Sequence, residues 1–398
     1  MELKAQPLGG KLFTRPFLVF LAIFLVAAWF VLKRFIYGIG AVTHLSDGYP
    51  WGVWIAYDVI IGCALACGGY GMAIIVYIAN KGRYHALVRP AVLTSAFGYT
   101  LAGVSILFDI GRYWQFYNLL LPTYIQFNSI MVEVALCIMA YVCVLWIELS
   151  PAFLERFNIG GKIKMYMEKA LFIIVALGIL LPTMHQSSLG SLLLIAGSKV
   201  SPLWHTPLLP LLFLTSCLVM GYCVVVAESF MSSVAFKRPY ETELLSKVGV
   251  VVASLTAAYL VLRFADLAVR GAINLSFEGD LKGGSFWIEN ALFAVPMILL
   301  FMPRTNRNPR VLFLSSAMLL LGAGLYRINT YIIGFSPGSN WSYFPSAPEL
   351  MITLGIISIE IMAYLVLVKK LPIMAGHEPE LKAGGLGAAR TEGGSFHE

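Results

Sequence analysis

Residues 180–191, LLPTMHQSSLGS, place a histidine, an amide and several hydroxyl groups next to an apolar run. Imidazole titrates near neutral pH, so His185 could donate a proton to a carbonyl-bearing ligand, with Gln186 beside it. The alternative is a histidine that caps a helix end and faces water. The pattern predicts an apolar helix that ends near His185 and continues as a polar loop. This stretch alone does not distinguish between a proton-donating role of His185 and a helix-capping role.

Four predicted helices each carry one titratable side chain near the same end: Asp58, Asp109, Glu133 and His185. An ionised side chain at the centre of a bilayer costs about 2.5–3.5 kcal/mol on insertion scales, so such groups usually face a bundle interior or a wet cavity. The pattern therefore predicts a polar pocket, with Trp54 and Tyr113 as flat walls. The alternative is that Asp109 pairs with Arg112 at the surface while the other groups cap helices.

The composition requires these groups to be positioned inside a membrane. The chain has 398 residues, of which 59% are hydrophobic and 12% charged, and its mean hydropathy is +0.80. A soluble domain carries about 25% charged residues. Runs of about 20 apolar residues predict an all-α, polytopic membrane protein. The ten predicted spans are residues 16–36, 54–80, 89–110, 128–148, 167–185, 208–231, 248–269, 286–302, 311–334 and 349–370.

The basic residues predict the orientation of these spans. Both tails and the even-numbered loops carry twenty lysines and arginines, and the odd-numbered loops carry six. Positive charge concentrates on the cytoplasmic side, so both termini are expected there, and His185 on the outer side. The net charge of +7 is accordingly assigned to loops at the lipid surface, and no nucleic-acid partner is expected.

Helices two to five and six to nine look like two copies of one four-helix unit. Hydrophobic-Glu-x-Ala-Leu occurs at Glu133 in the first copy and at Glu289 in the second. The predicted architecture is two four-helix bundles plus flanking first and last helices. The expected segments are 1–50 (tail, first flanking helix, outer loop), 51–200 (first bundle), 201–335 (second bundle), 336–372 (outer loop, last helix) and 373–398 (disordered tail).

Other residues limit the chemistry. The six cysteines lie in apolar runs without a CxxC pair, so packed thiols are expected and no metal site is. A membrane haem needs axial histidines within helices, and only His185 lies near an apolar core, which argues against haem or an iron–sulfur cluster in this chain. His377 and His397, in the tail, have no expected role. In the second bundle, Arg263 and Asp266 share a helical face, which suggests internal charge pairing with Glu289 nearby.

Three stretches carry a resemblance to a known family: YPWGVWIAYDVIIGCALACGGYGMA at 49–73, LFDIGRYWQFYN at 107–118 and LLPTMHQSSLGSLL at 180–193. They resemble the polysulfide-reductase membrane-subunit (NrfD) family, especially its members from [NiFe] hydrogenases, over nearly the whole chain. The resemblance implies a bacterial inner-membrane subunit with a haem-free site for menaquinone or ubiquinone. It further implies a ferredoxin-like iron–sulfur subunit and [NiFe] small and large subunits on the outer side, with no H2 chemistry in this chain.

The family places its pocket at the outer ends of the first bundle. By position, this carries over onto Asp58, Glu133 and His185 as catalytic residues. The expected quinone-binding residues are Trp54, Asp109, Arg112, Tyr113 and Gln186. Relatives with Asn and His on the first bundle helix and Tyr on the last differ from this chain, so the hydrogen-bond donor is expected on the other side of the pocket here.

Two other classes fit the same residues. Parallel repeats and buried carboxylates also suit a secondary transporter, although the acidic groups cluster at one face and not at the midplane. The third possibility is that the chain is a purely structural membrane anchor for a peripheral enzyme. Solute uptake by the chain alone favours the transporter, and copurifying quinone argues against the anchor.

Overall fold

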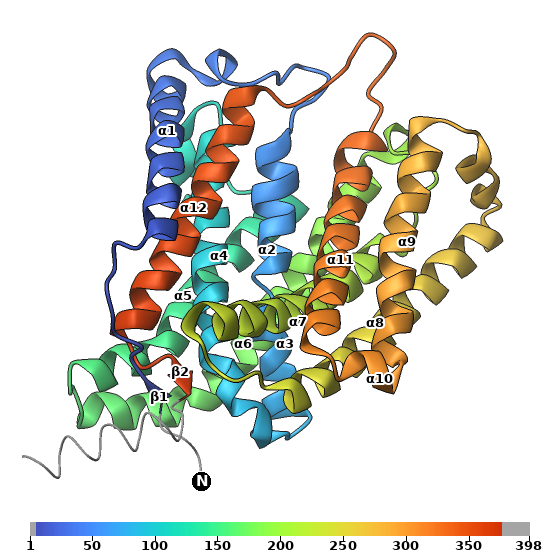
Figure 1. Ribbon diagram of the computed structural model, residues 1–398. Helices are drawn as coiled ribbons and strands as arrows, with labels where there is room; N and C mark the ends of the chain where they lie inside the picture. Colours follow the sequence, from blue (N-terminus) through green and yellow to red (C-terminus); the bar gives the residue numbers. More distant parts are fainter. Residues whose placement is uncertain (1–4, 376–398) are drawn as a thin grey trace, which may run out of the picture.

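The computed structural model describes residues 5–375 and is all-α apart from one two-stranded ribbon (Figure 1). Within these residues, 10 helices are long and apolar enough to cross a membrane. The predicted all-α, polytopic architecture is thereby confirmed. Residues 376–398, with His377, His397 and most of the expected tail, lie outside the described part.

The first bundle is built from the second to fifth spans. The second span is interrupted, and consists of η2 (Trp54–Ile61), α2 (Gly62–Leu65), α3 (Gly68–Ala73) and η3 (Ile74–Ile78). It packs against α4 (Val88–Asp109), which contacts α5 (Ile130–Arg156). Helix α6 (Lys162–Ile195) contacts both α5 and α3, and this closes the ring.

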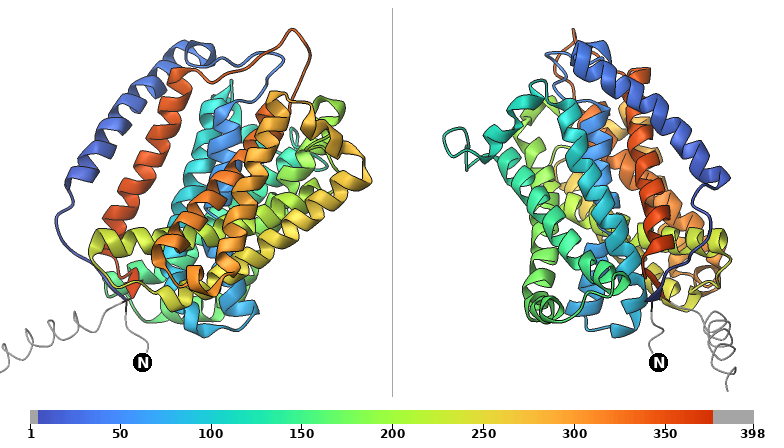
Figure 2. Two further views of the ribbon diagram at one scale, coloured as in Figure 1. Left: turned by 45° about the vertical axis from the view of Figure 1, so that its right-hand side comes forward. Right: turned by 90° about the vertical axis from the view of Figure 1, so that its left-hand side faces the viewer.

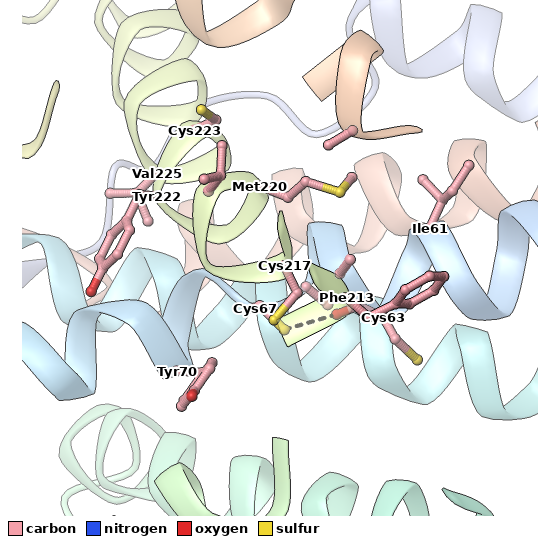
Figure 3. Packing of buried hydrophobic residues seen from close by; sticks show 14 of the residues in the cluster. Ile61, Cys63, Cys67, Tyr70, Phe213, Cys217, Met220, Tyr222, Cys223 and Val225 are labelled. Atoms are coloured by element: carbon pink, nitrogen blue, oxygen red, sulfur yellow. Dashed lines mark hydrogen bonds between the residues drawn. The ribbon is translucent and has the colours of Figure 1, made fainter. Parts of the chain in front are cut away.

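The second bundle is a ring of four helices. These are α7 (Leu209–Phe236), α8 (Thr242–Val269), α9 (Leu281–Phe301) and α11 (Pro309–Ile328), which η8 (Asn329–Ile333) continues. Helix α7 also packs on α2, α3 and α6, so it joins the two bundles. Figure 3 shows this seam, where cysteine and aromatic side chains of α7 face those of the second span. The remaining short helices are η1 (Ile39–Ala41), η4 (Gly82–Leu87), η5 (Tyr113–Leu120), η6 (Gly197–Lys199), η7 (Ala272–Phe277) and α10 (Pro303–Asn306).

Two flanking helices lie side by side along one side of the first bundle: α1 (Arg15–Tyr37) and α12 (Ala347–Lys370) (Figure 2). Strands β1 (Ala5–Gln6) and β2 (Met374–Ala375) pair antiparallel and tie the ends of both helices together. We call the end of the molecule with this ribbon the basal end, and the opposite end the distal end. Helix α12 also contacts α4 and η2, so it forms part of the wall around the predicted site.

The predicted end of the fifth span was wrong. Helix α6 runs through Pro182 and His185 and ends at Ile195, so the polar residues that suggested a loop are helical. The hydroxyl of Ser187 bonds back to Thr183 O at 3.0 Å, and that of Ser191 bonds to Ser187 O at 3.3 Å. Serine satisfied by its own helix fits an apolar environment. Membrane helices also tolerate an internal proline where neighbours and hydroxyl side chains satisfy the local backbone.

The expected internal charge pairing in the second bundle is present. Arg263 pairs across helices with Glu289 at 2.9 Å, and both side chains are buried. Asp266 pairs instead with Arg270, one turn further along α8, at 2.6 Å. The shared helical face of Arg263 and Asp266 therefore did not predict the ion-pair partner of Arg263. The buried guanidinium pairs with the carboxylate on the neighbouring helix α9.

Candidate functional site

Asp58 and Trp54 lie at the distal end, where η2 meets α12. Asp58 is 5% exposed, and its carboxylate accepts a hydrogen bond from the Thr353 hydroxyl at 3.0 Å. The Trp54 indole N–H donates to Glu349 O at 3.2 Å. The Glu349 side chain caps α12 together with Ser346, and the Tyr343 hydroxyl donates to it at 2.8 Å. The flanking helix thereby fixes both site residues of η2.

Asp109 closes this group from the last residue of α4. Its carboxyl group lies within electrostatic reach of Glu349 and of Arg34 on α1. The Arg34 guanidinium is committed to the backbone, since it donates to Phe108 O at 2.7 Å and to Ile110 O at 2.6 Å. One Asp109 oxygen, Oδ1, is buried without a hydrogen-bond partner among the described residues. A buried polar atom left unpaired costs free energy, so this oxygen lacks the hydrogen-bond partner that its burial calls for.

Tyr113 and Arg112 extend from the same end of α4 in different ways. The Tyr113 ring packs edge-on against Phe35 at 4.7 Å, and the Arg34 guanidinium lies 5.2 Å from its centre. Arg112 is exposed, and within the described chain it forms no ion pair with Asp109. We refer to Trp54, Asp58, Asp109 and Tyr113 as the outer group.

His185 lies in a second cluster, inside the first bundle. Its side chain is fully buried; Nδ1 bonds to Leu181 O at 2.8 Å and Nε2 to the Tyr99 hydroxyl at 2.9 Å. A carbonyl only accepts, so Nδ1 carries the proton and the neutral ring accepts at Nε2. The Tyr99 hydroxyl also lies 3.2 Å from Cys67 Sγ, and Gln186 Nε2 donates to it at 3.4 Å. We call His185, Tyr99, Gln186 and Cys67 the histidine group.

Glu133 occupies a third position, between α5 and α6. The Ser188 hydroxyl donates to its carboxylate at 2.8 Å. Ser188 is three residues after His185, and this spacing places both on the same side of α6. Glu133 therefore approaches the histidine group from the distal end of the bundle.

The structure thus divides the eight predicted site residues. Trp54, Asp58, Asp109 and Tyr113 gather against α12 and α1, His185 and Gln186 face Tyr99, Glu133 bonds to Ser188, and Arg112 is exposed. No hydrogen bond joins Asp58, Glu133 and His185 to one another among the described residues. The hydrogen bonds therefore place these residues in separate groups, and the single pocket at the ends of spans two to five stays a prediction.

Sequence reasoning missed Tyr99, Thr353 and Arg34. Tyr99 is a buried tyrosine in the middle of an apolar helix, and a polar aromatic at such a depth is a signal for a hydrogen-bond partner. Arg34, near the end of the first span, looks like an interfacial anchor. Thr353 carries no signal in the sequence, since a lone threonine in a helix usually bonds to its own backbone.

Burial and hydrogen bonding limit which of these side chains can contact a ligand. Trp54 is buried in a small apolar cluster with Val42 and Ile352, whereas Tyr113 is half-buried and Arg112 is exposed. Both nitrogens of His185 are engaged within the protein, and His85 stacks edge-on against Tyr77 at the basal end. Axial ligation needs a free imidazole nitrogen, which His185 does not present in this arrangement.

Comparison with known proteins places the chain among membrane subunits of redox complexes. A family model described as "Polysulphide reductase, NrfD" matches residues 41–335. The chain is 42% identical to the "Probable Ni/Fe-hydrogenase 2 b-type cytochrome subunit" of Escherichia coli, over 93% of this chain and 95% of that protein. It is 28% identical to the "Menaquinone reductase, integral membrane subunit" of Nitratidesulfovibrio vulgaris, over 87% of this chain and 86% of that protein.

Proposed function

The chain belongs to the polysulphide reductase NrfD family, and from that premise we propose that it is the quinone-reactive membrane subunit of a respiratory [NiFe] hydrogenase complex. In this role it takes electrons from a ferredoxin-like iron–sulfur subunit on the outer side of the bacterial inner membrane. The small and large hydrogenase subunits supply those electrons from H2. The electrons pass to menaquinone or ubiquinone, and no haem in this chain takes part.

The observation that carries the proposal is the outer group, with the buried and unpaired Asp109 Oδ1 at its edge. A quinone, when bound, accepts two electrons and two protons at its two carbonyl oxygens. Tyr113 offers its ring, Arg112 offers hydrogen-bond donors from the surface, and Asp109 holds or receives a proton at Oδ1. Trp54 is buried and supports η2 behind them. Asp58 is a second proton holder, one helix turn below Trp54, and Thr353 orients its carboxyl group.

The histidine group lies deeper than this, and its role follows from its hydrogen bonds. His185 would have to break its contact with Leu181 or with Tyr99 in order to donate directly to a ligand. We therefore assign His185 as a positioning residue for Tyr99, whose hydroxyl can both donate and accept. Glu133, which accepts a hydrogen bond from Ser188, supplies a carboxylate between the histidine group and the distal end.

The test is H2-driven reduction of a short-chain quinone by the intact complex in membranes. Asp109→Asn keeps the size of the side chain and removes its proton-holding capacity, and the rate should fall at least tenfold. Asp47→Asn is the matched control, because Asp47 is an exposed carboxylate in a loop at the same end. Reduction of a soluble viologen dye by the hydrogenase subunits should be unchanged in both. Equal quinone reduction in the two variants would remove Asp109 from the site.

A further inference from the structure

Helices α5 and α6 border a cavity of about 350 Å³ near the loop that joins them at the basal end (Figure 1). This volume lies in the range of about 300–1,000 Å³ that is typical of small-molecule sites in proteins. Three polar residues line the cavity, Glu148, Glu155 and Asn158, and the rest of its described wall is isoleucine, leucine, methionine, proline and glycine. The cavity is thus a mostly apolar site with a few polar groups, at the end of the molecule opposite the outer group.

The two carboxylates of the cavity differ in their partners. Arg89 donates to both oxygens of Glu155, at 2.9 and 2.7 Å, so the charge of Glu155 is balanced within the protein. Glu148 is half-buried and forms no hydrogen bond or ion pair with any residue that the structure describes. Its Oε2 lies 3.9 Å from the point where a Cβ atom of Gly178 would stand, so α6 presents no side chain there. The cavity therefore offers the carboxylate of Glu148 to a ligand.

The chemistry of the wall limits what this ligand can be. A carboxylate only accepts hydrogen bonds, so it favours a cationic donor, and a primary ammonium group carries three N–H donors. A quaternary ammonium group has no N–H donor and is typically bound by an aromatic cage. The described wall of the cavity contains neither an aromatic ring nor a basic side chain. The wall therefore fits a primary amine better than a quaternary amine or an anion.

The surroundings of the cavity are those of a lipid surface. Leu171 lines the cavity and is exposed, and the next two residues of α6, Phe172 and Ile173, are exposed as well. Exposed apolar side chains on a spanning helix suit contact with acyl chains. Arg156 at the end of α5 and Lys162 at the start of α6 are exposed beside the connecting loop. Basic side chains at helix ends lie at the level of the lipid head groups, where they attract phosphate.

We propose that the cavity between α5 and α6 binds a phospholipid with a primary-amine head group, as in phosphatidylethanolamine. The ammonium group pairs with Glu148, the phosphate lies toward Arg156 and Lys162, and the acyl chains follow the exposed apolar residues 171–173 of α6. The zwitterionic head group thus meets a carboxylate inside the cavity and basic side chains outside it. This site is separate from the outer group and does not depend on the function proposed above.

The experiment uses the purified full-length chain in detergent, stripped of lipid and titrated with phosphatidylethanolamine, phosphatidylcholine or phosphatidylglycerol that carry the same acyl chains. Native mass spectrometry gives the apparent Kd of the first lipid bound. The wild-type chain should bind phosphatidylethanolamine at least tenfold more tightly than the other two lipids. Glu148→Gln keeps the size of the side chain and removes its charge, so this preference should be lost. Glu243→Gln is the matched control, because Glu243 is an exposed carboxylate of α8 outside the cavity, and it should keep the preference.

Several outcomes would overturn the proposal. Equal affinity of the wild-type chain for the three lipids would show that the amine is not recognised, and tighter binding of phosphatidylglycerol would show that the site selects an anion. A preference retained in Glu148→Gln, or lost equally in Glu243→Gln, would place the recognition outside the cavity. Where Glu148→Gln fails to fold, Leu171→Trp fills the cavity from its exposed wall and leaves Glu148 in place. Loss of the preference in Leu171→Trp upholds the site, and wild-type binding overturns it.

Discussion

The Arg263 guanidinium and the Glu289 carboxylate form a buried ion pair, with 2.9 Å between Nη2 and Oε1. Trp204 and Asn329 donate to the other carboxylate oxygen, at 3.0 and 2.7 Å. In the first bundle the matching glutamate, Glu133, accepts a hydrogen bond from Ser188 and forms no ion pair with any described residue. The second bundle therefore neutralises its acidic group, whereas the first keeps a carboxylate without a counter-charge.

Arg263→Leu should destabilise the protein strongly. Loss of one partner leaves the other charge buried and uncompensated, at a cost of about 3–5 kcal/mol. The measurement is the midpoint of SDS-induced unfolding of the detergent-solubilised protein. Lys247→Met is the control, since it removes an exposed pair with Glu243 and should leave the midpoint unchanged. Similar midpoints for both variants would mean that the buried pair is not structural.

Tyr99→Phe and His185→Ala should each reduce H2-driven quinone reduction by tenfold or more, because His185 positions the Tyr99 hydroxyl and a general acid–base group typically contributes at least this much. The double variant should be no slower than the slower single variant, since both changes break the same 2.9 Å hydrogen bond. The rates of quinone reduction by the three variants in membranes give the coupling energy between Tyr99 and His185. Strictly multiplicative losses would show that the two residues act separately, and wild-type turnover in His185→Ala would remove His185 from the mechanism.

Gly221→Ala should weaken the seam between the two bundles. A Cβ at Gly221 would lie 2.5 Å from the Cys67 carbonyl oxygen, which is backbone and cannot rotate away. Overpacking of this kind costs about 1–3 kcal/mol. Gly103→Ala is the matched control, because Gly103 is also helical and a Cβ there meets no atom within 4 Å. Its better helix propensity should leave stability equal or higher. Thermal unfolding midpoints of the two variants test this prediction. Equal destabilisation by Gly221→Ala and Gly103→Ala would contradict the close contact at Gly221.

Tyr343→Phe should lower stability at neutral pH and change its dependence on alkaline pH. The Tyr343 hydroxyl accepts from Val53 N–H and donates to Glu349, both at 2.8 Å, so its loss leaves two groups unpaired. This costs about 1–3 kcal/mol. Burial raises the pKa of the Tyr343 phenol above its ordinary value. The unfolded chain then releases its proton first, so the stability contributed by Tyr343 is lost as the pH rises above about 10.

Unfolding midpoints measured from pH 8 to pH 11 test this prediction. The wild-type curve should fall more steeply above pH 10 than the Tyr343→Phe curve, because the variant has no phenol at this position. Phe344→Leu is the control for a neighbouring change, since Phe344 is exposed. Parallel curves for the wild type and Tyr343→Phe would show that the Tyr343 phenol has the same pKa in the folded and the unfolded chain.

The span count could be predicted because it depends on local apolar length, which is a property of consecutive residues. The exception is α6, where polar residues 186–191 suggested a loop. Helical serines satisfied by their own backbone, and a buried glutamine beside Tyr99, explain the error. Hydropathy averages over the polar face of a helix and does not tell a helix that lines a bundle from a loop.

The partners of the site residues could not be predicted, as Asp58 shows. Its hydrogen-bond donor, Thr353, lies 295 residues away on the last helix, and Tyr99 and His185 lie 86 residues apart. The amino-acid sequence by itself determined that the protein spans a membrane with ten helices and keeps a small set of titratable residues inside it. Only the tertiary structure decided which of them meet, because helix packing between distant segments sets those contacts and leaves no periodic signal in the chain.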